Sequence, residues 1–132
     1  MYKFENLEVW HLALEYTDMV YKITEKLPKS EDYNLKSQTV RAATSIALNI
    51  AEGSTGQTNA EFARFITMAV RSCIEVIACL ILIKQRGYID KKMYSEVYEF
   101  GGRVFAKLQA LKKSLLRTAD HRQRTTDHRQ RT

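Results

Sequence analysis

The segment from Arg41 to Gly53, RAATSIALNIAEG, constrains the fold more than any other part of the sequence. Its apolar and small residues recur every three or four positions, which is the period of one buried face of an α-helix. Ala42, Ala43 and Ala47 keep this face shallow, so a neighbouring helix can approach closely. The pattern predicts a helix packed tightly against another helix. The positions on the face are Leu35, Thr39, Ala42, Ala43, Ile46, Ile50 and Gly53.

Polar residues of the same segment raise separate expectations. Arg41, Ser45 and Glu52 fall on a second stripe of the helix, away from the core. A carboxylate in the last turn opposes the helix dipole, so we expect a nearby arginine to compensate Glu52. Asn49 lies beside the buried stripe, and we interpret it as a buried amide that bonds to a neighbouring helix rather than as a catalytic group.

The composition favours a single all-α domain. The 132 residues contain one proline and five glycines, which leaves few breakers and favours long helices. Short connections between helices of similar length predict antiparallel neighbours, so the simplest fold is an up-down-up-down four-helix bundle over residues 1–117. The predicted helices cover about residues 6–27, 35–52, 59–86 and 90–116.

Capping residues set the predicted helix ends. Asn6 is a candidate N-cap of the first helix, and Pro28 ends that helix. Gly53 is the expected C-cap of the second helix. Thr58 or Asn59 caps the third helix, Gly87 closes it, and Asp90 opens the fourth.

Two of the helices carry more apolar surface than a lone bundle needs. Each has a second apolar stripe besides the one that faces the core. We expect these stripes to form a subunit interface in a homo-oligomer, with Trp10 as an anchor. The stripe of the first helix contains Leu7, Trp10, Leu14 and Tyr21, and that of the third contains Val70, Ile74, Ile81 and Leu82.

The charge is uneven, since the formal net charge is +6 and the basic residues concentrate after residue 58. An outward stripe of the fourth helix predicts a surface that binds nucleic-acid phosphates without sequence preference. The stripe contains Arg103, Lys107, Ser114 and Arg117, with Lys113 at its edge, and Arg64, Arg71, Lys84 and Arg86 of the third helix extend the set. An open alternative is an assembly module that binds another protein, whose charge serves solubility or steers it to an acidic partner.

The last residues repeat DHRQRT at Asp120–Thr125 and again at Asp127–Thr132. The repeat has no apolar position and cannot supply a coiled-coil seam. We therefore expect residues 118–132 to form a disordered or frayed basic tail.

Catalytic and metal-binding patterns are scarce. Glu8 and His11 have the Glu-x-x-His spacing of di-iron bundles, but both lie on the polar arc of their helix and no second pair exists. Cys73 and Cys79 point to different sides of their helix, and we interpret them as buried free thiols. We expect a non-enzymatic, cytoplasmic protein without cofactor, metal or membrane association.

Three segments resemble a known family. FENLEVWHLALE, LPKSEDYNLKSQTVRAATSIALNIAEG and ARFITMAVRSCIEVIACLILIKQRGYI are similar to the four-helix-bundle family of 23S rRNA intervening-sequence proteins, which is related to the accessory variability protein of diversity-generating retroelements. The resemblance covers roughly Phe4 to Leu116, and its most specific part is NIAEG with Arg41 upstream. It implies an antiparallel four-helix bundle in a ring-like homo-oligomer, typically a pentamer. The partners it implies are further copies of the chain, RNA or DNA, and a reverse transcriptase or another protein.

Overall fold

The structure is a computed structural model that describes the backbone of residues 1–131 and the side chains of residues 1–118. Every regular element in this part of the chain is helical, and no strand occurs in it. The elements are the 3-10 helix η1 (Lys3–Asn6), α1 (Glu8–Thr24), the 3-10 helix η2 (Lys29–Glu31), α2 (Leu35–Ser54), α3 (Asn59–Gln85) and α4 (Lys91–Arg131).

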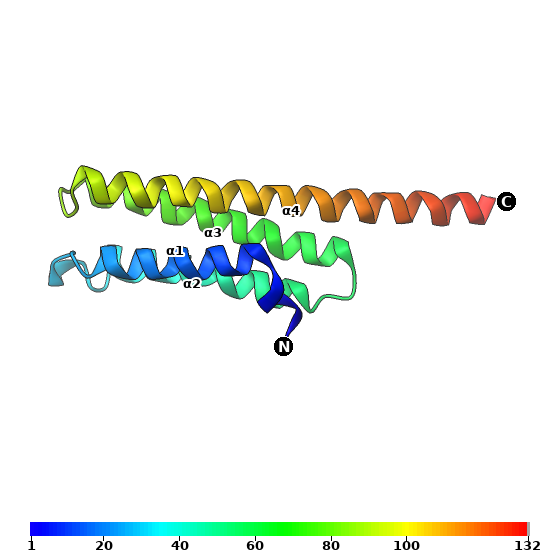
Figure 1. Cartoon of the computed structure of the whole chain (residues 1–132), viewed down its shortest axis with the longest axis horizontal. Coiled ribbons are helices and arrows are strands. Elements are labelled where there is room, and N and C mark those ends of the chain that lie inside the picture. The colour runs from blue at the N-terminus through cyan, green and yellow to red at the C-terminus, as the bar shows by residue number, and fades with distance from the viewer. Residues whose placement is uncertain (132) are drawn as a thin grey trace.

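Each of the four long helices packs against two others. α1 contacts α2 and α4, and α3 contacts the same two helices, whereas the diagonal pairs are not in backbone contact within the described residues. The α1–α2 and α3–α4 connections lie at one end of the bundle, and the α2–α3 connection lies at the other (Figure 1). Large apolar side chains from all four helices fill the space between them. The most deeply buried of these are Tyr16, Ile46, Ile50, Ile66, Leu80 and Leu108.

Local capping signals fix both ends of α3 and the start of α4, as the sequence predicts. The Thr58 hydroxyl accepts a hydrogen bond from the Glu61 N–H at 3.1 Å, and Asp90 Oδ1 accepts one from the Met93 N–H at 2.8 Å. Gly87 has a φ of 79°, in the left-handed region. Its N–H bonds to the Lys84 carbonyl and the next N–H to the Ile83 carbonyl, the pattern of a Schellman motif.

The predicted ends of the first helix are wrong. Asn6 belongs to η1, because Glu5 accepts a hydrogen bond from the Tyr2 N–H at 2.7 Å and holds a separate 3-10 turn there, so α1 begins at Glu8. At the other end, the N–H of Leu27 bonds to the Thr24 carbonyl three residues back. The helix thus tightens before Pro28 and ends at Thr24 rather than at residue 27.

Gly53 is not the C-cap of the second helix. α2 continues through Gly53 to Ser54, and the only glycine with a positive φ in the described chain is Gly87. A Cβ at Gly53 would lie 2.5 Å from the Cβ of Phe65 on α3. The residue is therefore a glycine because α2 and α3 approach each other closely at this point.

The fourth helix is longer in the structure than the predicted range 90–116, since it continues to Arg131. The sequence after Gly102 contains neither glycine nor proline, so no residue stops the helix locally. The C-terminal part of α4 projects beyond the other three helices (Figure 1). A helical segment that packs against no other helix is only marginally stable in water. Fraying of residues 118–132 therefore stays a prediction. The side chains of the DHRQRT repeats lie outside the described part.

α3 is long and apolar enough, by length and composition, to cross a membrane. Its most apolar stretch has a mean hydropathy of 2.2, and 39% of that stretch is buried inside the bundle. The core helix of a folded bundle passes the same test, so this property is weak evidence for a membrane span. It does show that α3 carries apolar side chains on more than its buried face.

Candidate interaction surfaces

The predicted basic stripe lies on the outer side of α4. Arg103, Lys107, Lys113 and Arg117 are all exposed. The Arg103 guanidinium lies over the Phe100 ring, 5.2 Å from its centroid, and Lys107 Nζ lies 3.4 Å from Glu8 Oε1 of α1. Both groups of this ion pair are well exposed, so the pair contributes about 0–1 kcal/mol and leaves Lys107 free to exchange partners.

The sequence interpretation missed one further cation of α4, which lies on another side of that helix from Arg103. Lys112 lines a hollow of about 680 Å³ on α4, and the other described residues along it are Gln109, Lys113, Leu116 and Arg117. Three adjacent cations therefore gather where α4 leaves the bundle. The signal that could have found Lys112 is the KKSLLR run itself, which places three cations within six residues of the projecting helix.

The cations of α3 do not form one cluster. Arg64 and Arg71 are exposed and lie two turns apart on the same stripe. Lys84 lies over the Tyr94 ring of α4, 4.3 Å from its centroid. Arg86 lines a cavity near Glu31 at the end of the bundle. The structure therefore supports Arg64 and Arg71 as free surface cations, and gives Lys84 and Arg86 local partners.

The predicted interface residues divide into two groups. Leu7 and Trp10 are half-buried against the core, and the Trp10 ring meets the Phe4 ring edge-on at 4.6 Å. In contrast, Leu14 and Tyr21 on α1 are exposed, as are Ile74 (50% exposed) and Ile81 (45%) on α3. Trp10 thus already anchors the N-terminal turn of its own chain, and its role in an interface stays a prediction.

Two expectations about the motif residues are wrong. Asn49 Nδ2 donates to the carbonyl and hydroxyl oxygens of Ser45, at 2.9 and 3.0 Å, so it bonds within its own helix. The bond that crosses to α3 joins the hydroxyls of Ser45 and Ser72 at 2.9 Å. Glu52 is exposed and forms no ion pair among the residues with described side chains, so the expected arginine partner is not found there. Arg41 is also exposed.

Glu31 is a structural residue that sequence reasoning missed. It is buried, and its carboxylate accepts hydrogen bonds from the Tyr88 hydroxyl at 2.9 Å and from Asn34 Nδ2 at 3.0 Å. These hydrogen bonds lower the pKa of Glu31, and the N–H of Leu35 and the charge of Arg86 act in the same direction. Glu31 thus connects the α1–α2 connection to the segment after α3.

The two cysteines are buried free thiols, as predicted. Cys73 Sγ donates to the Gly101 carbonyl at 3.6 Å, and burial raises the pKa of Cys73 to about 12. Burial also raises the pKa of Tyr16, whose hydroxyl is buried beside Gly101 without a hydrogen-bond partner among the described residues. Neither group ionises readily at neutral pH, so neither is an activated nucleophile.

The Glu8 and His11 pair has another explanation than metal binding. A ring nitrogen of His11 lies 2.7 Å from the Glu5 carbonyl and holds the N-terminal turn, while Glu8 pairs with Lys107. No group of three or more His, Cys, Asp or Glu residues able to hold a metal ion occurs where side chains are described. The absence of a metal or cofactor from the whole chain stays a prediction.

Comparison with known proteins decides the family. The family model of the 23S rRNA-intervening sequence protein matches residues 5–110. The chain belongs to this family. The resemblance drawn from the three sequence segments is therefore confirmed. The match ends within α4, so the projecting end of that helix and the DHRQRT repeats lie outside the part that defines 23S rRNA-intervening sequence proteins.

A solved structure has a similar fold. The chain is similar to the crystal structure of a protein of unknown function from the S23 ribosomal protein family of Bacteroides thetaiotaomicron. The TM-score is 0.74 and the identity is 23%, over 80% of this chain and 98% of that chain. At this identity the likeness shows the fold alone. A comparison with curated proteins finds no match.

Proposed function

We propose that this protein is a non-enzymatic, oligomeric nucleic-acid-binding protein that acts in the cytoplasm as an accessory factor of a ribonucleoprotein. The observation that carries the proposal is the row of exposed cations along α4, from Arg103 to Arg117. Lys107 is the only one of its predicted members with an ion-pair partner among the described side chains. Exposed cations without partners are suited to phosphates, because neutralising each phosphate releases condensed counterions.

The second part of the proposal is that antiparallel up-down-up-down bundles assemble into a ring. The exposed apolar residues Leu14 and Tyr21 belong to α1, whereas Ile74 and Ile81 belong to α3, which lies diagonally opposite α1 in the bundle. Two different patches on opposite helices fit a head-to-tail interface, in which one patch of each copy meets the other patch of the next. Such interfaces close into a ring when the rotation between successive copies completes a full turn. The family resemblance favours five subunits.

Assembly strengthens the proposed binding. A ring presents one copy of the α4 stripe for each subunit, so a single strand or duplex can contact several stripes at once. Linked contacts raise overall affinity well above that of one stripe without any new chemistry. The contacts are to phosphates, so the binding is largely indifferent to sequence, and no cofactor or metal takes part.

The test is a titration of labelled RNA and duplex DNA at about 50 and 200 mM salt. The double variant Arg103→Glu with Lys107→Glu should weaken binding and lower the salt slope by about one unit for each phosphate that the variant no longer neutralises. The matched control is Lys91→Glu with Lys92→Glu, an equal charge change in the first turn of the same helix. An equal effect of both variants would show that net charge alone matters and would contradict the proposed stripe.

A second candidate function is a protein–protein assembly scaffold with no nucleic-acid role, in partnership with a reverse transcriptase or another protein. Met68, an exposed apolar side chain on a further side of α3, favours it, because Met68 does not belong to the predicted interface stripe of that helix. Absence of binding to either nucleic acid at the lower salt concentration would support this candidate over the first.

A further inference from the structure

A second surface, remote from the α4 stripe, combines aromatic rings with groups that bond to bases. A groove of about 380 Å³ lies between the end of α1 and the first half of α2. Its volume is within the range of about 300–1,000 Å³ that is usual for small-ligand sites. Its lining consists of Tyr21, Asp32, Tyr33, Lys36, Ser37, Val40 and Arg41.

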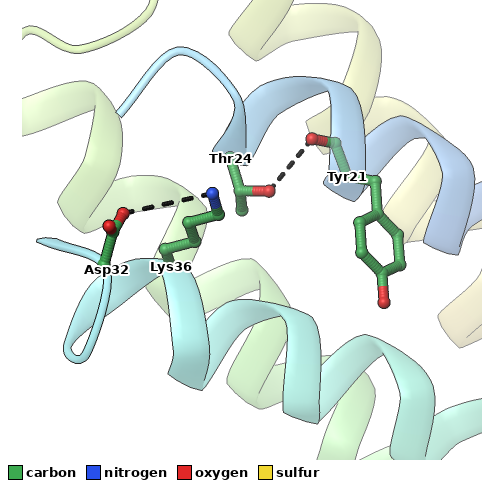
Figure 2. A network of polar contacts seen from close by, with 4 residues as sticks. All are labelled: Tyr21, Thr24, Asp32 and Lys36. Carbon is green, nitrogen blue, oxygen red and sulfur yellow. Dashed lines mark hydrogen bonds and ion pairs between the residues drawn. The ribbon is translucent and has the colours of Figure 1, made fainter. Parts of the chain in front are cut away.

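Two tyrosines line this groove, and they differ in exposure. Tyr33 is 98% exposed and Tyr21 is 48% exposed. Tyr21 projects from α1 towards α2, on the side where Lys36 also stands (Figure 2). Neither ring packs on another aromatic ring in the described part of the chain. The Tyr33 ring, which is almost fully exposed, is therefore available to stack on a planar ligand.

The charges in and beside the groove nearly cancel. Lys36 Nζ lies 4.0 Å from Asp32 Oδ1, a loose and exposed ion pair (Figure 2). Arg41 has no ion pair or hydrogen bond through its side chain among the described residues, and Glu75 faces it across a second hollow. Two cations against two carboxylates leave little net attraction for a polyanion. Any ligand of this groove would therefore be held mainly by stacking and hydrogen bonds.

The groove continues across α2. The second hollow, of about 300 Å³, shares Tyr33, Ser37 and Arg41 with the first and adds Asn34, Gln38 and Glu75. Asn34 Nδ2 donates to Glu31, and Gln38 Nε2 lies 3.4 Å from Glu75 Oε1, so each amide has one hydrogen-bond partner within the protein. An amide makes up to four hydrogen bonds, so each retains donor and acceptor capacity for the edge of a base. The path thus has room for more than one planar group beside an exposed ring.

We propose that this groove binds unpaired bases of the nucleic acid that the α4 stripe holds, with Tyr33 as the stacking surface. The inference rests on the proposed nucleic-acid function and specifies its ligand as single-stranded. A duplex keeps its bases stacked inside the double helix, so it can contact the phosphate-binding stripe but cannot stack a base on Tyr33. Stacking on an aromatic side chain contributes a large, sequence-tolerant and salt-insensitive share of affinity.

The experiment compares Tyr33→Ala with Tyr33→Phe, since Tyr33 is too exposed for either change to disturb the fold. Binding is measured to a short oligouridine, to the same strand without its bases, and to a duplex. Tyr33→Ala should weaken binding to the oligouridine by about fivefold to a hundredfold, equally at low and high salt, and Tyr33→Phe should not. Neither variant should affect the abasic strand or the duplex. Tyr2→Ala, a change at another exposed tyrosine, is the control.

The outcomes separate this inference from the proposed function. If Tyr33→Ala bound oligouridine as the wild type does, the proposed base site would be wrong. If the Arg103→Glu with Lys107→Glu variant at the same time lost affinity in a salt-dependent way, the proposed α4 stripe would still stand. Failure of the wild type to bind any of the three ligands would overturn both. Tyr33-dependent binding of polyglutamate in place of oligouridine would overturn the base site in favour of an acidic protein.

Discussion

The two sides of α3 have similar residues and opposite surroundings. On the inner side, Ile66 and Leu80 are completely buried among the other helices. On the outer side, Ile74 and Ile81 keep about half of their surface in water. Burying an isoleucine or leucine side chain fully contributes about 1.5–3 kcal/mol, so about half of this free energy is still to be gained at each of Ile74 and Ile81. The difference shows that the inner side packs within this chain, and it supports the proposal that another copy of the chain covers the outer side.

The largest effect on stability is expected at Gly53, where α2 and the inner side of α3 approach each other closely. Gly53→Ala should destabilise the protein by about 1–3 kcal/mol, because the added Cβ would meet Phe65 of α3 at 2.5 Å. Gly102→Ala is the matched control, since it lies inside α4 and a Cβ there would meet nothing within 4 Å. That variant should gain about 0.5–1 kcal/mol from helix propensity. Thermal unfolding of both variants checks this, and equal shifts would remove the argument for close packing.

A moderate effect is expected at Glu31, whose hydrogen bond from Tyr88 joins the α1–α2 connection to the segment after α3 at the end of the bundle. The hydrogen bonds from Tyr88 and Asn34 hold the pKa of Glu31 below its ordinary value of 4.5. A carboxylate with a lowered folded pKa stabilises the protein fully above the ordinary value, and this stability is lost as the pH falls through the folded pKa. Glu31→Gln should therefore lower the melting temperature at neutral pH, and its difference from the wild type should shrink in acid. A difference independent of pH would contradict the role of the charge.

The smallest effect is expected at Tyr16. Its hydroxyl is buried without a partner among the described residues, so Tyr16→Phe removes a desolvated group and should be neutral or stabilise by up to about 1 kcal/mol. Tyr88→Phe makes the same chemical change but removes a donor to Glu31, and should destabilise. Denaturant unfolding of the two variants would show opposite signs. A clear loss of stability on Tyr16→Phe would mean that its hydroxyl has a partner.

The sequence predicted the parts of the fold that depend on local signals. The four helices, the buried stripe of α2 and the caps at Thr58, Gly87 and Asp90 follow from periodicity and from residues within four positions of one another. The ends of α1 were missed because a 3-10 turn before it and tightened bonds before Pro28 compete with the helix. These are small energetic differences that composition does not resolve.

Contacts between residues that are distant in the sequence could not be predicted from it. Gly53 resembles a C-cap in the sequence, and only the position of Phe65 on the next helix shows that it is a contact point. Glu31 reads as part of a polar connection because its partner Tyr88 lies far along the chain. The exposed stripe on α4 was predicted by periodicity, whereas the groove at Tyr33 depends on how α1 and α2 meet.

Sedimentation at micromolar concentration tests the central claim, that the outer side of α3 is covered by another copy of the chain. The wild type should sediment as an assembly, and Ile74→Asp with Ile81→Asp should sediment as a folded monomer with an unchanged helical spectrum. Leu116→Asp, which alters a similarly exposed leucine on the projecting part of α4, should leave the assembly intact. A wild type that sediments as a monomer would contradict the account.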